Sequence, residues 1–466
     1  MTALDERRGA ARVATISALI VVAAFVAGKA ARDAILLSHF SIQSLPLFIG
    51  IAAVLSFPVI LIAGRLMTRF GPARLVPVLN VVSAGFAVGE WLLLGRFPRV
   101  IAVVVFIHLS TASAVLVSGF WSIVNERFDV QTAKRHIGRI GMGATLGGIL
   151  GGLVAERTAV HLPPNMILLV LAGLQLVCAG TLFAFGRTSL SEAAEAPSEG
   201  TWTALRHAAK APLFRNVGLI VVLGAVAAGL IDYVFKADIV AAASNGELLR
   251  SLAVFYTITN VLTAVIQLSV CGPIIARLGV PRSVATLPIT VTAFSLVALV
   301  IPIPMSAAFA RAAELVTRNS IYRSGYELLY APLPEERKRP TKVVLDVGAD
   351  KVGDIFGAQL VALIVFAAMD ARMMLLMAAV ITGVLALFFA MRLPRSYTKA
   401  LEDSLLDHAA EVAAVEPPAP AHAEPWLSLT GLPTFGNPDA VPLRMRSRTR
   451  RRATPPPARV NHGPHD

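Results

Sequence analysis

Ionisable residues lie within long apolar runs of this sequence, where a charged side chain must have a specific role. Placing such a group at the centre of a bilayer costs about 2.5–3.5 kcal/mol on insertion scales. Lys29, Arg32 and Asp33 follow an i, i+3, i+4 spacing, and Asp232 and Lys236 are four residues apart. On a helix each set shares one face. There the charges either neutralise one another or bind a charged solute.

Arg311, Glu314 and Arg318 form a third set with this spacing, and here two cations flank one carboxylate. Net positive charge within a membrane segment favours an anionic solute, and guanidinium groups suit phosphate or carboxylate. The alternative is a structural triad in which the two arginines only hold Glu314. The residues predicted to bind the solute are Lys29, Arg32, Lys236, Arg311 and Arg318.

A stripe of carboxylates follows Lys342 at four-residue intervals, and His108 stands alone in another apolar run. Within membrane segments, groups of this kind relay protons in pumps and transporters. Glu90, near the end of its run, is interpreted instead as a residue that reaches the membrane surface. The residues predicted to couple or gate transport are Asp33, His108, Asp232, Glu314, Asp346, Asp350 and Asp354.

The glycines of 138–152 do not form a phosphate-binding loop, because no strand precedes them and the lysine-serine ending is absent. The spacing of Gly143, Gly147 and Gly151 indicates close helix packing instead. The two cysteines, Cys178 and Cys271, cannot form a metal cluster by themselves. Since no catalytic set of residues stands out, we expect no enzyme activity, no cofactor and no metal.

The elements that must position these residues are membrane helices. Of the 466 residues, 56% are hydrophobic and 15% are charged; soluble domains have roughly 45–50% and 25%. About 20 apolar residues span the hydrocarbon core, which predicts an all-α polytopic membrane protein with twelve transmembrane helices. Their approximate ranges are 12–37, 45–64, 75–94, 100–124, 138–158, 164–186, 216–238, 251–272, 283–303, 305–330, 343–368 and 371–392.

The formal net charge of +13 arises largely in short loops and the C-terminal tail, so it indicates membrane topology rather than nucleic-acid binding. Basic clusters such as 65–74 and 337–342 fall on one side, whereas the other side has isolated residues such as Arg96 and Arg250. Basic loops face the cytoplasm. We therefore expect a multi-pass inner-membrane protein with both termini in the cytoplasm. The tail arginines either contact anionic membrane lipids or only keep the tail soluble.

A short motif recurs in the second half of the chain at a shift of about 208 residues. With six segments on each side of the repeat, the two halves have the same orientation in the membrane. The predicted parts are an N-terminal six-helix half (1–186), a cytosolic linker (187–215), a C-terminal six-helix half (216–393) and a disordered cytosolic tail (394–466). The two copies read Gly64-x4-Arg69-x-Gly71-x2-Arg74 and Gly272-x4-Arg277-x-Gly279-x2-Arg282.

This motif resembles the loop between helices 2 and 3 of the major facilitator superfamily, although Thr68 and Ala276 stand in place of its aspartate. The resemblance implies a fold of the major facilitator type, with two parallel six-helix repeats. In that fold helices 1, 4, 7 and 10 line a central cavity, and three of these would carry the cations named above.

Other residues resemble the ATP/ADP translocase family and its bacterial relatives, over about residues 27–360. The resemblance implies a nucleotide-type transporter. Two lysines of that family are replaced here by Ile35 and Asp354, which weakens the expectation of ATP/ADP exchange and favours a smaller or less charged anion. The matching residues are Arg32-Asp33, Phe120-Trp121, Asn125-Glu126, Ala133-Lys134-Arg135, Gly141, Glu327–Pro334, Lys342, Asp346 and Gly353.

The sequence thus predicts a secondary transporter that works by alternating access on a small anionic solute, such as a nucleotide or another phosphate-bearing compound. One alternative is a proton-coupled carrier or drug exporter of the major facilitator type. The other is a membrane sensor or scaffold that transports nothing. Solute flux in proteoliposomes separates the transporters from the scaffold, and a requirement for a pH gradient separates the two transporters.

Overall fold

The computed structural model describes residues 3–127, 130–186, 206, 210–243, 247–330, 332–333, 341–342 and 344–415. Most of the predicted linker, the basic loop 334–340 and the predicted tail after residue 415 lie outside these ranges. Every regular element in the described part is helical, which confirms the all-α prediction.

The N-terminal half contains six long helices and two short 3-10 turns. Apolar segments form them because a helix pairs all of its own backbone groups, as the hydrocarbon core requires. The elements are α1 (Ala3–His39), η1 (Ile42–Ser44), α2 (Leu45–Phe70), α3 (Pro72–Leu94), α4 (Pro98–Arg127), α5 (Val130–His161), η2 (Pro164–Met166) and α6 (Ile167–Gly186).

The C-terminal half is more interrupted, and two of its segments include π-helical turns. These turns, η3 and η4, lie beside charged residues of the predicted site. The elements are α8 (Pro212–Ala242), α9 (Leu248–Ser269), α10 (Cys271–Leu278), α11 (Val280–Val284), α12 (Thr286–Val300), α13 (Pro304–Thr317), η3 (Arg318–Tyr322), α14 (Arg323–Leu328), η4 (Val344–Ala349), α16 (Asp350–Ala367), α17 (Ala371–Ala390) and α18 (Leu393–Val415).

Ten helical runs of the described chain are long and apolar enough to cross a membrane. They coincide with ten of the twelve predicted segments. The other two, 305–330 and 343–368, contain α13, η3 and α14 and then η4 and α16, and both carry several charges. The charges that make these two segments candidates for function are also the reason why they are less apolar than the other ten.

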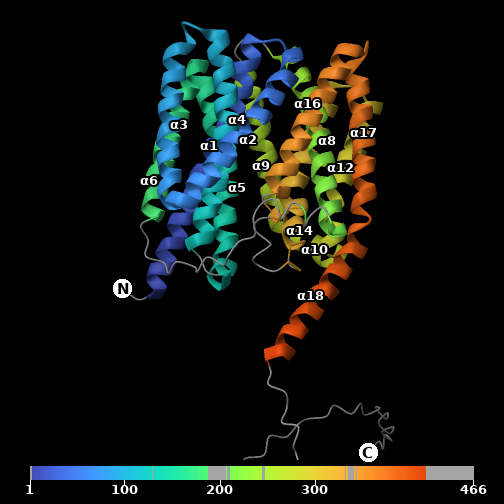
Figure 1. Cartoon of the computed structure of the whole chain (residues 1–466). Helices are drawn as coiled ribbons and strands as arrows, with labels where there is room; N and C mark the ends of the chain where they lie inside the picture. The colour runs from blue at the N-terminus through green and yellow to red at the C-terminus, as the bar shows by residue number, and fades with distance from the viewer. Residues whose placement is uncertain are drawn as a thin grey trace, which may run out of the picture. The chain divides into compact units, whose positions relative to one another are not determined.

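Equivalent helices make equivalent contacts in the two halves. In the N-terminal half α1 packs against α5, α4 and α6, and in the C-terminal half α8 packs against α16, α13 and α17. The halves meet through α5 with α9 and through α2 with α16, two contacts that the repeat interchanges. Figure 1 shows the blue and teal helices of the first half beside the green and orange helices of the second. This pairing is what two parallel six-helix repeats require.

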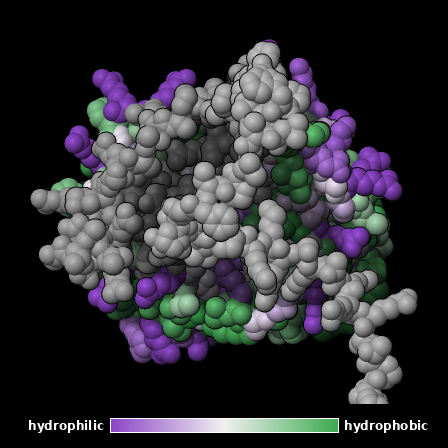
Figure 2. All heavy atoms as spheres, turned by 90° about the horizontal axis from the view of Figure 1, so that it is seen from below, coloured by the Kyte–Doolittle hydropathy of each residue, from purple (hydrophilic) through white to green (hydrophobic). Residues whose placement is uncertain are grey.

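The repeated motif forms the same turn in both halves. Gly71 and Gly279 have φ angles of 76° and 78°, a left-handed conformation that glycine adopts without steric cost. Each glycine N–H donates to the carbonyl four residues earlier, on Met67 and Ile275, at 2.9 Å. Arg69, Arg277 and Arg282 lie in the last turns of adjoining helices. Hydrophilic side chains rim the end of the bundle seen in Figure 2.

Glycines of α5 allow α1 to approach backbone to backbone. A Cβ atom added to Gly147 would meet the backbone carbonyl of Leu19, and one added to Gly151 would meet that of Ala23. Gly143 has a similar contact with Thr15. The close helix packing predicted from this spacing is therefore confirmed.

Replacing Gly147 by alanine is expected to destabilise the protein, because its methyl group would displace α1. The matched control is Gly141→Ala on the same helix, where an added Cβ meets nothing within 4 Å. Alanine is the better helix former by about 1 kcal/mol, so the control should be neutral or slightly more stable. Thermal unfolding of both variants in detergent gives the comparison. Equal melting temperatures would contradict the packing role.

The last helix continues past the predicted start of the tail. Residue 394 lies near the beginning of α18, which ends at Val415. The segment is rich in alanine, leucine and glutamate, which are good helix formers. These residues explain why this part of the predicted tail is helical. Residues of both predicted halves and of α18 up to His408 belong to a single compact unit.

Candidate functional site

A chain of alternating charges connects the two halves through α1, α8 and α13. Asp33 of α1 forms an ion pair with Lys236 of α8, with 2.8 Å between Oδ2 and Nζ. The same Nζ lies 2.7 Å from Oδ2 of Asp232, one turn earlier on α8. Oδ1 of Asp232 lies 3.0 Å from Nε of Arg311 on α13.

Glu314 extends this chain by holding two arginines. Its Oε2 lies 2.5 Å from Nη1 of Arg311, and its Oε1 lies 2.5 Å from Nε of Arg318. At the other end, Arg32 lies 3.4 Å from Asp33. We call the whole set the central charge chain: Arg32, Asp33, Lys236, Asp232, Arg311, Glu314 and Arg318.

Burial follows the order of the central charge chain. The five inner members are all buried, and Glu314 is 0% exposed, while the terminal arginines, Arg32 and Arg318, are 22% and 23% exposed. Buried charges persist only when they are paired, and the alternation gives every inner residue an opposite neighbour. The geometry matches the structural-triad alternative for Glu314, since both arginines are occupied by carboxylates.

The two terminal arginines have further partners. Arg32 donates from Nη1 to the Ser110 hydroxyl of α4 at 2.8 Å, and its guanidinium lies 5.4 Å from the Phe106 ring centre. Arg318 donates from Nη2 to the backbone carbonyl of Gly224 at 2.9 Å. These contacts fix the ends of the chain to α4 and α8.

Lys29 is the cation of the site that has no carboxylate partner within ion-pair distance among the described residues. Its Nζ lies 4.6 Å from the centre of the Tyr256 ring on α9, across the boundary between the halves. The side chain is partly exposed. The Tyr256 hydroxyl is buried and has no hydrogen-bond partner there either. Lys29 and the four cations of the chain outnumber the three carboxylates, so the site is net positive.

Three predicted coupling residues lie outside the central charge chain. Asp346 accepts from the Tyr326 hydroxyl, and Asp354 pairs with Lys351 at 2.7 Å. Asp350 begins α16 and forms no ion pair among the described residues. The four-residue stripe predicted for this segment is interrupted, because η4 changes the helical period before Asp350.

His108 also lies apart from the chain, and it has a partner that the sequence analysis missed. Its Nδ1 lies 2.9 Å from Oε1 of Glu90, and its Nε2 lies 2.8 Å from the Ser83 hydroxyl. Glu90 is only 3% exposed, so its interpretation as a surface-reaching residue is wrong. Ser83 and Glu90 are seven residues apart, which places both on one face of α3; that spacing was the available signal.

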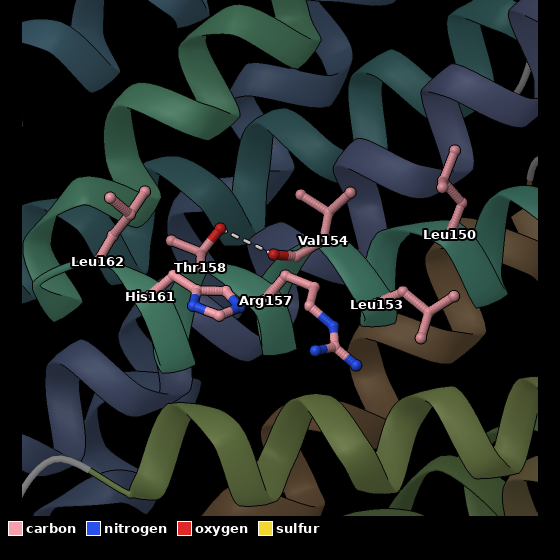
Figure 3. Close-up of a pocket in the computed structure, with 7 residues that line it drawn as sticks. All are labelled: Leu150, Leu153, Val154, Arg157, Thr158, His161 and Leu162. Carbon is pink, nitrogen blue, oxygen red and sulfur yellow. Dashed lines mark hydrogen bonds between the residues drawn. The ribbon is translucent and has the colours of Figure 1, made fainter.

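A groove of about 380 Å³ lies along α5, on the face shown in Figure 3. It is mainly apolar, and its lining includes the polar side chains of Arg157 and His161. The Thr158 hydroxyl, drawn in Figure 3, donates to its own helix at the Val154 carbonyl, 2.7 Å away. None of the predicted site residues lines this groove, which one helix and the residue after it form alone.

Comparisons with known proteins establish the fold. No family model matches the sequence, and no curated protein matches it. The chain is similar to crystal structures of a variant of the nucleoside transporter NupG (12% identity, 83% of this chain and 99% of that chain, TM-score 0.59) and of an autoinhibited POT family peptide transporter (12%, 83% and 97%, 0.58). A bacterial homologue of the human lysosomal transporter Spinster, inward-facing and unoccupied, is also similar (15%, 86% and 98%, 0.52). The chain shares the all-helical fold of these structures, which agrees with the major facilitator type of fold that the sequence predicts.

Proposed function

We propose that this protein is a secondary transporter that moves a small anionic solute across the membrane by alternating access. The fold supports this proposal, because the structures similar to it are transporters for nucleosides and peptides. The predicted localisation in an inner membrane, with cytoplasmic termini, belongs to the same proposal.

The observation that supports an anionic solute is the cation without an ion-pair partner at the boundary between the halves. Lys29 is partly exposed as a residue, has an aromatic ring 4.6 Å from its Nζ and has no carboxylate within ion-pair distance in the described structure. A phosphate or carboxylate placed there would neutralise Lys29 and lie one turn of α1 from Arg32, whose side chain is 22% exposed. Charge-assisted hydrogen bonds of this kind are the strong ones.

The central charge chain would link this site to the movement of the halves. The Asp33–Lys236 pair is the contact by which α1 and α8 bridge them. An anion on Lys29 and Arg32 competes with Asp33 for Arg32, so binding changes the charge balance around the Asp33–Lys236 pair. Alternating access requires a difference in binding between states.

Two residues favour an anion smaller than ATP. Ile35 stands where the translocase family has a lysine, and its side chain is buried in the hydrophobic core. Asp354 replaces the other lysine and is paired with Lys351. Neither position offers a cation to a triphosphate. We expect weak or absent ATP/ADP exchange.

The test is a thermal-shift panel followed by counterflow in proteoliposomes. The panel contains inorganic phosphate, nucleoside monophosphates, ATP, dicarboxylates, and uncharged nucleosides as controls. We expect at least one small anion to raise the melting temperature and to exchange across vesicles. Stabilisation by a cationic drug alone would favour the exporter. Vesicles that exchange none of the panel would support a scaffold that transports nothing.

A further inference from the structure

Ser83, Glu90 and His108 form a buried polar cluster between α3 and α4. His108 bridges the two others, with 2.9 Å from Nδ1 to Glu90 and 2.8 Å from Nε2 to Ser83. The side chains of Glu90 and Ser83 are 3% and 4% exposed, and that of His108 is 12% exposed. The central charge chain uses none of these residues.

Glu90 is incompletely satisfied in this arrangement. Its second carboxylate oxygen, Oε2, is buried and has no hydrogen-bond partner in the described structure. An ionised carboxylate inside a membrane helix is stable only when its charge and its oxygens are compensated. A proton supplies that compensation, either on His108, which makes an ion pair, or on Glu90 itself.

The charged groups on neighbouring helices do not compensate Glu90 instead. From α1 these are Lys29, Arg32 and Asp33, which belong to the proposed solute site, and His39, whose Nδ1 lies 2.9 Å from the carbonyl oxygen of Ile35; the other charged residues of α1 all precede residue 13. From α2 they are Arg65 and Arg69 near its far end, and α6 contributes none. Ion pairs of Glu90 in the described structure involve His108 alone.

The cluster has the hydrogen-bond order of a serine hydrolase triad, but its burial excludes that chemistry. A reacting carbonyl must come within about 3 Å of the nucleophile and of an oxyanion donor. Ser83 is 4% exposed, and the Phe86 ring lies 5.5 Å from the imidazole. A proton can reach such a cluster, whereas an ester or amide cannot.

A small cavity with three polar side chains in its lining lies in the same half of the protein. It has a volume of about 20 Å³ and lies between α1, α3, α4 and α6, and Asn80, Ser113 and Gln175 contribute to its lining. Asn80 is one turn from Ser83 on α3. Cavities above roughly 10–15 Å³ hold a water molecule when they have polar partners. One water there would extend the line of exchangeable protons from His108 towards α6.

We propose that Glu90 and His108 form a proton-binding site in the N-terminal half, separate from the central charge chain, and that its protonation makes transport depend on pH. The second clause rests on the proposed transport function, and the first does not. Without the proton the site holds a Glu90 carboxylate and a neutral His108 imidazole. The bound proton converts it either to an ion pair, with the proton on His108, or to a neutral pair, with the proton on Glu90. This change alters the attraction between α3 and α4 without involving the solute cations.

Infrared titration of the protein in lipid nanodiscs, without any solute, tests the proton site. Wild type should show carboxylate bands that change on acidification. Glu90→Gln should lose part of this change, and His108→Gln should move it along the pH axis. The control, Glu247→Gln, removes an exposed carboxylate outside the cluster and should retain the part of the change that Glu90→Gln loses, at the same pH as in wild type. The proposal would be overturned if His108→Gln titrated like wild type and Glu90→Gln lost only a band typical of an exposed carboxyl group.

Counterflow in proteoliposomes tests the link to transport, using the anion that the thermal-shift panel selects. Wild-type exchange should vary with pH, and Glu90→Gln and His108→Gln should each flatten that dependence. Exchange that keeps its pH profile in both variants would overturn the second clause. If wild type exchanges nothing while Glu90 still titrates, the transport function fails and the proton site stands.

Discussion

Replacing Glu314 by glutamine is expected to lower the free energy of unfolding by about 3–5 kcal/mol, as removal of one partner from a buried ion pair does. Glu314 is 0% exposed and holds both Arg311 and Arg318. The glutamine keeps the volume but leaves two guanidinium groups to share one neutral amide. Thermal unfolding in detergent should show a large fall in melting temperature.

The chain offers a matched control for this variant. Glu327 also lies between two cations, with 2.8 Å to Arg323 and 2.5 Å to Lys342, but its side chain is 38% exposed. Exposed ion pairs contribute only about 0–1 kcal/mol, so Glu327→Gln should unfold close to wild type. The double variant Glu314→Gln/Arg318→Gln should recover part of the loss, because one stranded cation is gone. Equal stability of both single variants would refute the buried triad.

Replacing Lys29 by methionine is expected to weaken anion binding at least tenfold, or by about 1.4 kcal/mol, while leaving thermal stability nearly unchanged. No carboxylate is paired with Lys29 in the described structure, so its removal strands no buried charge. The methionine side chain can retain the contact with Tyr256. Titration of the variant with the anion selected by the thermal-shift panel measures the affinity.

Lys351→Met is the control for a lysine that is partly exposed but lies outside the proposed site. Lys351 pairs with Asp354 on α16, and its loss should not change affinity for the anion. Lys236→Met provides the opposite contrast, because it would leave the buried carboxylates of Asp33 and Asp232 with one cation each and so destabilise the protein. Wild-type affinity in Lys29→Met would show that the anion binds elsewhere.

The sequence by itself determined the fold class, because hydrocarbon imposes helices of a known length on apolar segments. Ten of the twelve predicted segments appear as apolar spans, and the repeated motif predicted the equivalent turns at Gly71 and Gly279. The glycine spacing on α5 likewise predicted close packing. Each of these predictions depends on a local sequence pattern, whose effect does not depend on how the helices pack in the tertiary structure.

The tertiary structure alone decided which charges meet. Helical spacing placed Arg311, Glu314 and Arg318 on one face, but it could not show that Asp232 and Asp33 continue the chain across two other helices. The same limit hid the pairing of Glu90 with His108, since the residues belong to different helices whose rotation the sequence does not specify. An isolated carboxylate in the sequence became half of a buried pair because α3 and α4 present those faces to each other.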